Sequence, residues 1–184
     1  MDILLTHGYF LRDDPHELKI MKPYPPLGIL YIASYLKSRG FDVGIFDATF
    51  SSLDAFREYL TRERPSVVGI YTNMMTKRAV LEMARLARAH GAAVILGGPE
   101  PPYYAADYLQ RGADVIVRGE GELTLAELLP HLARHGLNQL DAIAGIAFRD
   151  GDRRVIETLP RPFIPDLSAH PWPDREAIDI PRYI

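Results

Sequence analysis

Short apolar segments alternate with amphipathic segments along most of the chain. The apolar segments are rich in Val, Ile and Leu and show little polar alternation, which is typical of strands buried on both faces. The amphipathic segments place apolar residues three and four positions apart, which predicts helices with one buried face. The predicted strands are residues 2–7, 42–48, 66–72, 92–97 and 113–119, and the predicted helices are residues 26–40, 53–63, 77–91, 103–112 and 123–136.

This alternation predicts an α/β fold. Strands that are buried on both faces imply a parallel sheet covered by helices. Five strand–helix units of this length indicate a flavodoxin-like (Rossmann-like), doubly wound domain at residues 1–136, with five parallel strands in the order 2-1-3-4-5. Thr124 and Glu127 have the spacing of a capping box, which fits a last helix that starts after Gly121.

Three stretches depart from the regular alternation. Residues 8–25 form a loop much longer than an ordinary strand-to-helix connection, and long loops inside compact domains are usually functional. Residues 137–159 include a predicted β-hairpin that turns at Asp150 and Gly151. Residues 160–184 hold six of the fifteen prolines, so we expect a linker without regular structure.

Composition narrows the classes of function. With 184 residues, the chain suits one globular domain and an extension. Its formal net charge of −3 provides no basic footprint for nucleic acid or anionic membrane. No apolar run reaches the roughly 18 residues of a membrane span, so we expect a cytoplasmic protein.

The chain has no cysteine. This excludes disulfides, zinc–thiolate sites, a thiol nucleophile and any iron–sulfur cluster that this chain would ligate. Any chemistry that needs such a cluster must use residues outside this sequence.

The carboxyl ends of the predicted strands are where an open α/β sheet binds its ligand. These ends are rich in Gly, Thr and Asn and carry no cluster of acids and bases, so they predict a binding surface and no catalytic residue. Common nucleotide motifs do not fit. There is no Walker A pattern, and Gly119-x-Gly121-x-x-Thr124 lacks the third glycine of a dinucleotide fingerprint and follows the fifth strand.

Four motifs, in order along the chain, carry a family resemblance. They are "PPLGILYIASYLKSRGFDVGIFDA", "VVGIYTNMMT", "ILGGPEP" and "GADVIVRGEGELTLAELL". Together they resemble the N-terminal cobalamin-binding domain of B12-dependent radical SAM enzymes, from the first strand to Leu129. The hairpin and the Pro-rich segment also resemble the linker that precedes the radical SAM barrel in those enzymes.

The resemblance implies that cobalamin is the cofactor, with the corrin ring over the strand ends and its nucleotide tail inside the domain. Gly97 and Gly98 would then form a strand end without side chains against the tail. The residues implied in cofactor binding are Thr6, His7, Gly8, Tyr9, Pro26, Leu27, Gly28, Asp47, Tyr71, Thr72, Asn73, Met74, Met75, Thr76, Gly97, Gly98, Pro99, Glu100, Gly119, Glu120 and Gly121.

A histidine ligand to cobalt is not indicated. Many cobalamin domains use an Asp-x-His-x-x-Gly motif, but here Asp14-x-His16 is followed by Lys19 in place of the glycine. His7 lies nearer the expected site and lacks the preceding Asp. The resemblance therefore implies cobalamin with its own base detached and no protein ligand to the metal, with His16 or His7 as alternatives. Met74 or Met75 would meet the lower face of the ring.

The implied function is that of a cobalamin-binding module in a larger, methyltransferase-like enzyme. S-adenosylmethionine and the [4Fe-4S] cluster would belong to a radical SAM domain outside this sequence. A weak lower ligand would favour methyl transfer to a substrate radical. Two alternatives remain open: a stand-alone flavodoxin-like domain that binds a nucleotide or flavin, and a corrinoid shuttle protein, which the missing ligand motif disfavours.

Overall fold

Seven strands form a single sheet in the order β2-β1-β3-β4-β5-β6-β7. The computed structural model describes residues 1–184 except for the side chain of Ala169. The first five strands are parallel, so the predicted order 2-1-3-4-5 is confirmed. The strands are β1 (Ile3–His7), β2 (Val43–Phe46), β3 (Val67–Tyr71), β4 (Ala93–Gly97), β5 (Val115–Val117), β6 (Ile146–Arg149) and β7 (Val155–Glu157).

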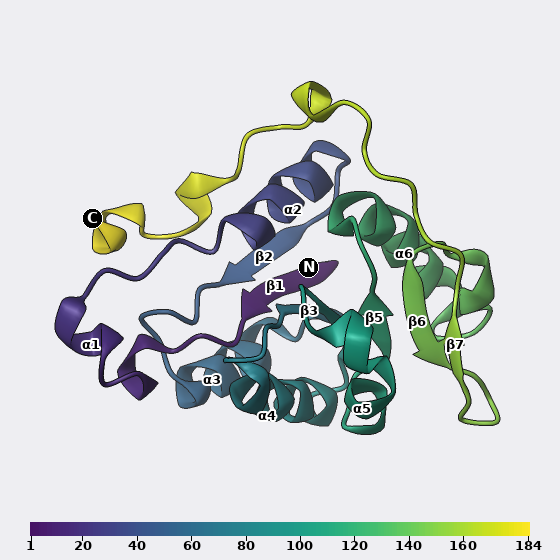
Figure 1. Ribbon diagram of the computed structural model, residues 1–184, viewed down its shortest axis with the longest axis horizontal. Helices are drawn as coiled ribbons and strands as arrows, with labels where there is room; N and C mark the ends of the chain where they lie inside the picture. The colour runs from purple at the N-terminus through teal and green to yellow at the C-terminus, as the bar shows by residue number, and fades with distance from the viewer.

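Helices cover both faces of the sheet, as expected for a doubly wound domain (Figure 1). One face packs against α2 (Leu27–Ser38) and α6 (Gly121–His135). The other packs against α3 (Leu53–Glu63), α4 (Lys77–Ala89) and α5 (Ala105–Gln110). Alternate residues of each central strand enter the two cores, and this double burial explains their continuous apolar sequence.

The predicted hairpin is part of the main sheet. β6 pairs antiparallel with β5, and β7 pairs antiparallel with β6. Ile146, Ala147 and Phe148 are buried in the cores of the parallel domain. The hairpin at residues 145–158 thus extends the five-stranded sheet, and its pairing with β5 was not part of the sequence prediction.

Two local predictions differ from the structure. The long loop contains a 3₁₀ turn, η1 (Leu11–Asp13), and a one-turn helix, α1 (Glu17–Ile20). Asp14 stabilises the start of α1 by accepting hydrogen bonds from the backbone N–H groups of His16 and Glu17, each at 3.1 Å. The capping box was wrong, because Thr124 lies inside α6 and donates to the Glu120 carbonyl at 2.7 Å.

Residues 160–184, called the C-terminal segment below, contain only 3₁₀ turns: η4 (Leu167–Ala169), η5 (Arg175–Ala177) and η6 (Ile180–Tyr183). The segment leaves the hairpin, passes α6, runs along α2 and ends near the loop that contains α1 (Figure 1). His170 stacks on Tyr35 with ring centroids 4.9 Å apart, and Asp174 pairs with Lys37 at 2.6 Å. The segment therefore lies against the domain.

The pairing of β5 with β6 predicts the effect of truncation. A chain that ends at residue 136 should be several kcal/mol less stable than one that ends at residue 159. It loses five buried apolar residues, which are Leu140, Ile143, Ile146, Ala147 and Phe148, and burying one large apolar side chain contributes about 1.5–3 kcal/mol. Urea denaturation followed by circular dichroism measures the difference. Equal midpoints for the two chains would contradict the role of the hairpin in the sheet.

Candidate functional site

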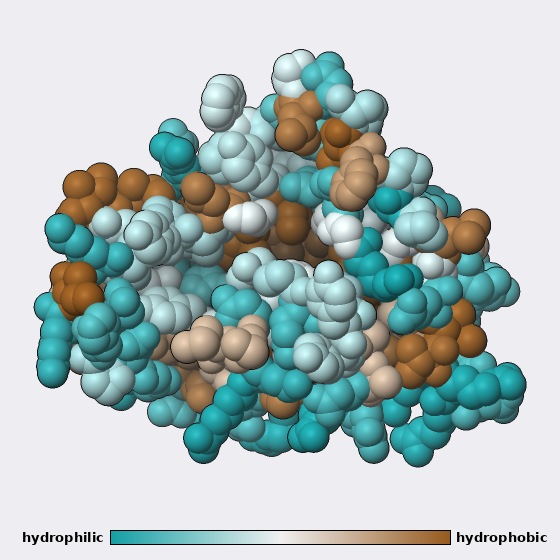
Figure 2. Space-filling view, viewed as in Figure 1, coloured by the Kyte–Doolittle hydropathy of each residue, from teal (hydrophilic) through white to brown (hydrophobic). Residues whose placement is uncertain are grey.

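Two adjoining cavities open at the carboxyl ends of the parallel strands. The broad cavity encloses about 670 Å³ and the narrow slot about 220 Å³, and both are lined by Gly28, Ile29 and Tyr71. They lie beside the ends of β1 and β3, where the strand order reverses and the flanking helices diverge. Figure 2 shows a hollow with an apolar floor at the centre of this face.

The narrow slot lies between α2 and α6. Gly28, Ile29 and Ile32 line it from α2, and Gly121, Glu122 and Leu125 line it from α6; strands β1, β3, β4 and β5 supply the floor. Most of its side chains are aliphatic: Leu5, Ile29, Ile32, Ile70, Ile95, Val117 and Leu125. The slot therefore suits a flat apolar group.

Gly97 and Gly98 both line the slot, but for different reasons. A Cβ at residue 97 would have Val117 Cβ as its nearest neighbour at 3.8 Å, so a side chain there would extend into open slot. A Cβ at residue 98 would lie 2.3 Å from the Thr72 carbonyl oxygen, and the backbone φ is +109°. Gly98 is thus required by the chain's own backbone, whereas Gly97 keeps the slot open.

The broad cavity has one wall from the sheet and one from the long loop. Tyr9, Asp14, Glu17, Pro23 and Tyr24 line it from the loop. The strand-end side is formed by His7, Thr49, Tyr71, Asn73, Met75 and Thr76. The functional loop predicted at residues 8–25 is therefore a cavity wall.

The turn after β3 fixes the polar residues near this cavity. Asn73 Oδ1 accepts from the Thr76 N–H at 3.0 Å, and Thr76 Oγ1 accepts from the Asn73 N–H at 3.2 Å. This reciprocal pair leaves the two methionines between them largely exposed. Met75 lines the cavity and Met74 does not.

His7 is held at both ring nitrogens. Its Nδ1 accepts from the Tyr9 N–H at 3.3 Å, and its Nε2 lies 3.1 Å from Asp47 Oδ1. Since Nδ1 accepts, the proton of a neutral ring lies on Nε2, where it bonds the carboxylate. His7 lines the broad cavity but offers no free nitrogen to it.

Asp47 is the centre of this network. It also accepts from the Thr49 N–H at 3.0 Å and from the Tyr183 hydroxyl at 2.6 Å. Burial disfavours the carboxylate and raises the pKa of Asp47, but the hydrogen bonds from His7, Tyr183 and Thr49 outweigh it and leave that pKa below its ordinary value. Burial and the bond to Asp47 raise the pKa of Tyr183.

The cavities bring together most of the residues predicted from the strand ends. Those that line a cavity are His7, Tyr9, Pro26, Leu27, Gly28, Tyr71, Asn73, Met75, Thr76, Gly97, Gly98, Gly119 and Gly121. Those that line neither are Thr6, Gly8, Asp47, Thr72, Met74, Pro99, Glu100 and Glu120. Glu100 instead accepts a hydrogen bond from the Tyr108 hydroxyl. Asp47 bonds His7, which lines the broad cavity.

His16, the alternative cobalt ligand, lines neither cavity. Its side chain is 80% exposed and lies 3.6 Å from Glu17 Oε1. Within the part of the chain that the structure describes, no three His, Asp or Glu side chains group closely enough to hold a metal ion. None of the described helices is long and apolar enough to cross a bilayer.

Several lining residues were missed from sequence. Gly69 lies on the slot floor within β3, and a glycine inside an apolar strand signals a close approach of this kind. Ile32 and Leu125 follow the same helical period as core residues, so the sequence pattern cannot tell a residue that lines the slot from one that packs in the core. Thr49 directly follows the second predicted strand and could have been named from that position, whereas Tyr24 carries no signal of position before the long loop is folded.

A family model now identifies the domain. The model described as "B12 binding domain" matches residues 18–129. The chain belongs to the B12-binding domain family. A similar protein is the anaerobic magnesium-protoporphyrin IX monomethyl ester cyclase of Synechocystis sp., with 36% identity over 170 residues, 86% of this chain and 33% of the relative. The hopanoid C-3 methylase of Methylococcus capsulatus is 29% identical over 158 residues, 83% of this chain and 29% of the relative.

Solved structures show the same fold. The B12-binding domain superposes on the cobalamin-dependent S-adenosylmethionine radical enzyme OxsB with aqua-cobalamin bound, with a TM-score of 0.75, 20% identity, and coverage of 88% of this chain and 22% of that chain. For the radical S-adenosylmethionine methyltransferase TsrM from Kitasatospora setae, the TM-score is 0.69 at 19% identity, with 85% of this chain and 30% of that chain covered. The chain spans about a third of the length of its curated relatives.

The lowered pKa of Asp47 predicts a pH-dependent contribution to stability. Asp47→Asn should lower the free energy of unfolding at pH 7 by about 1–3 kcal/mol, because hydrogen bonds to a charged acceptor are replaced by neutral ones. Because the pKa of Asp47 is lower in the folded state, its carboxylate stabilises the fold at pH values above the ordinary Asp pKa. This contribution is lost as the pH falls through the folded-state pKa. The difference from wild type should therefore shrink below about pH 4. Urea unfolding at pH 7 and pH 3 tests this, and an equal difference at both would contradict it.

Proposed function

We propose that this B12-binding domain holds cobalamin with the nucleotide tail in the narrow slot and the corrin ring in the broad cavity. The observation that carries the proposal is the junction of a narrow apolar slot with a broad cavity at the point where the strand order reverses. A flavin or mononucleotide needs one such space, whereas a macrocycle with a long tail needs two that connect.

The slot residues fit the chemistry of the tail. Its benzimidazole is a flat aromatic group, which suits aliphatic walls such as Ile95, Val117 and Leu125. Gly121 and Glu122 line the slot in the first turn of α6, where backbone N–H groups lack helical partners and favour a phosphate. Gly97 leaves the strand end bare beside these groups.

We further propose that the protein supplies no ligand to cobalt. Both nitrogens of His7 are engaged, and His16 is exposed and lines neither cavity. Tyr71 and Met75 line the broad cavity, and they would meet the ring and exclude water from it without binding the metal strongly. Bound cobalamin would supply a cobalt centre able to carry a methyl group.

The proposed parent is a B12-dependent radical SAM enzyme of the methyltransferase type. The chain covers about a third of its curated relatives, one of which is named a methylase. With no cysteine, it cannot ligate a [4Fe-4S] cluster, so the cluster and S-adenosylmethionine would be bound by another domain of the parent. The role of this chain is then to hold and orient the cobalamin.

The ligand assignment for cobalt has a spectroscopic test. After hydroxocobalamin is added and free ligand is removed by desalting, the protein should retain corrin absorption of the base-detached form. His7→Ala and His16→Ala should show the same spectrum at saturation, because neither ring coordinates cobalt. Failure of the wild type to retain corrin would refute cobalamin binding, and a changed spectrum in either variant would refute the ligand-free metal.

The tail slot has a separate test that uses cobinamide, a corrinoid without the nucleotide tail. Gly97→Leu should weaken cobalamin binding by about tenfold or more, since a side chain there fills the slot, and tenfold corresponds to about 1.4 kcal/mol. Cobinamide binding should be unchanged. Gly151→Leu, in the open hairpin turn, is the matched control for both ligands. Equal loss of both ligands in Gly97→Leu would contradict the slot assignment.

A further inference from the structure

The C-terminal segment reaches the carboxyl end of β2 from a distant part of the chain. The Tyr183 hydroxyl donates to Asp47 Oδ2 across 136 residues of sequence. The Tyr183 ring also packs edge-on against Phe50 with centroids 4.8 Å apart, and Arg182 lies over the same Phe50 ring at 4.2 Å. The end of the segment is thus anchored on the residues that follow β2.

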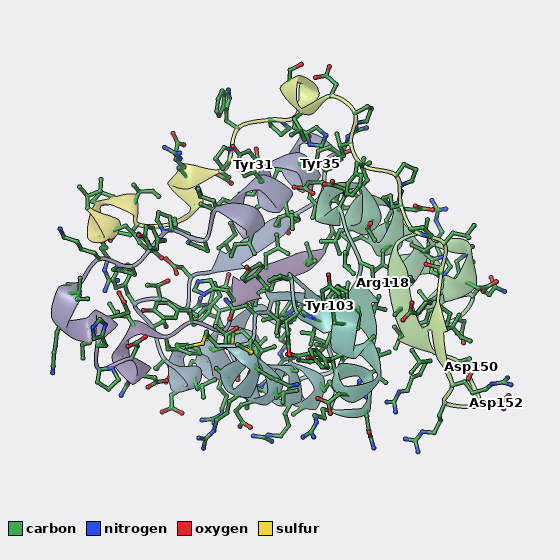
Figure 3. The ribbon with its side chains drawn as sticks, viewed as in Figure 1. Tyr31, Tyr35, Tyr103, Arg118, Asp150 and Asp152 are labelled. Carbon is green, nitrogen blue, oxygen red and sulfur yellow. The ribbon has the colours of Figure 1, made fainter. Side chains whose placement is uncertain are left out.

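Other contacts also hold the segment, among them a hydrogen bond from the Asp174 N–H to the Leu30 carbonyl at 3.2 Å and an ion pair of Arg161 with Glu127. Arg161 Nε donates to Thr124 Oγ1 at 2.9 Å, and its Nη2 donates to the Ala144 carbonyl at 3.2 Å. Further along, the segment meets α2 through the Tyr35 stack and the Lys37 pair. Figure 3 labels Tyr31 and Tyr35 along α2, beside the segment that passes over it.

Three large apolar side chains of the segment contribute little to holding it in place. Phe163 is 84% exposed and Trp172 is 85% exposed, and Leu167 is also exposed. Pro173 is buried, but the segment exposes these three large side chains and contains no strand or α-helix, so it belongs to the less stable part of the fold. An exposed ion pair such as Lys37–Asp174 contributes about 0–1 kcal/mol, whereas a hydrogen bond to a partly buried carboxylate is stronger. The Tyr183–Asp47 bond is therefore the principal anchor of the segment end.

The same carboxylate sets the wall of the broad cavity. Asp47 Oδ1 bonds His7 and the Thr49 backbone, and both residues line that cavity. Tyr183 occupies the other oxygen, so the carboxylate is fixed from both sides. Loss of the Tyr183 bond would remove one of the constraints on the carboxylate that orients the His7 ring.

An open space lies between the end of the segment and the long loop. A third cavity of about 620 Å³ separates the segment end from the long loop, with Arg182 on one side and Leu18 and Met21 on the other. Thr49 lines both this cavity and the broad one. The residues that follow β2 therefore connect the segment end with the broad cavity.

We propose that Tyr183 is a positioning residue of the cofactor cavity, so that docking of the C-terminal segment and binding of the corrin ring stabilise each other. The inference rests on the proposed cobalamin function. Coupling of two equilibria is reciprocal: if the docked segment strengthens corrinoid binding, a bound corrinoid strengthens docking by the same factor. Both directions are measurable.

The first measurement compares corrinoid affinities. Tyr183→Phe removes only the hydroxyl and should weaken cobalamin and cobinamide equally, by about fivefold or more. An equal loss of affinity for both corrinoids indicates an effect on the ring cavity, because a change in the tail slot weakens binding of cobalamin only. Phe163→Ala, in the same segment and largely exposed, is the matched control and should bind both ligands as wild type does. Thermal unfolding checks that each variant is folded.

The second measurement follows the segment itself. In the wild type, cobinamide should slow backbone hydrogen exchange in residues 174–184, and this protection should be lost in Tyr183→Phe. The Asp47→Asn/Tyr183→Phe double variant should bind cobinamide no more weakly than Asp47→Asn alone, because both changes break one network. A purely structural role for Tyr183 would give additive losses and no ligand-dependent protection.

The outcomes separate the two proposals. If the wild type retains no corrinoid, the proposed function fails and the coupling fails with it. If wild type and Tyr183→Phe bind cobinamide equally, the coupling alone is overturned. Protection of the segment that persists in Tyr183→Phe would likewise overturn it.

Discussion

The parallel pairing of five strands is the constraint on which the rest of the molecule depends. Each connection must return the chain to the starting edge, so all five carboxyl ends meet at one edge of the sheet. The strand order reverses between β1 and β3, which sends α2 and α4 to opposite faces. The space between the diverging helices is where the cavities form, and a bare Gly97 keeps its inner part open.

The strand–helix units of the parallel domain could be predicted from sequence, because each unit has its own local pattern. Strands buried on both faces must be apolar throughout, and helices with one buried face must be periodic, so the five units and their order followed from pattern. The residues at the strand ends followed from topology. His7, Tyr71 and Gly97 lie at the ends of three such strands, and each of them lines a cavity.

The remaining features depend on partners that are distant in sequence. Ile146–Arg149 has the same pattern whether its hairpin stands alone or pairs with β5, and only the folded sheet decides. Thr124 has capping-box spacing, but it is buried within α6, bonds its own helix and accepts from Arg161. The Tyr183–Asp47 contact joins two common residue types across the whole chain, so no local signal marks it.

The two cavities differ in stiffness. The slot is bounded by central strands and by two helices of 12 and 15 residues, all of which contribute to the core. The outer wall of the broad cavity comes from a loop whose one-turn helix α1 buries no residue. A ligand therefore meets a rigid socket at one end and an adjustable wall at the other. On the proposed placement of cobalamin, the slot would select the tail by shape, and the loop wall would accommodate a change in bulk on the ring.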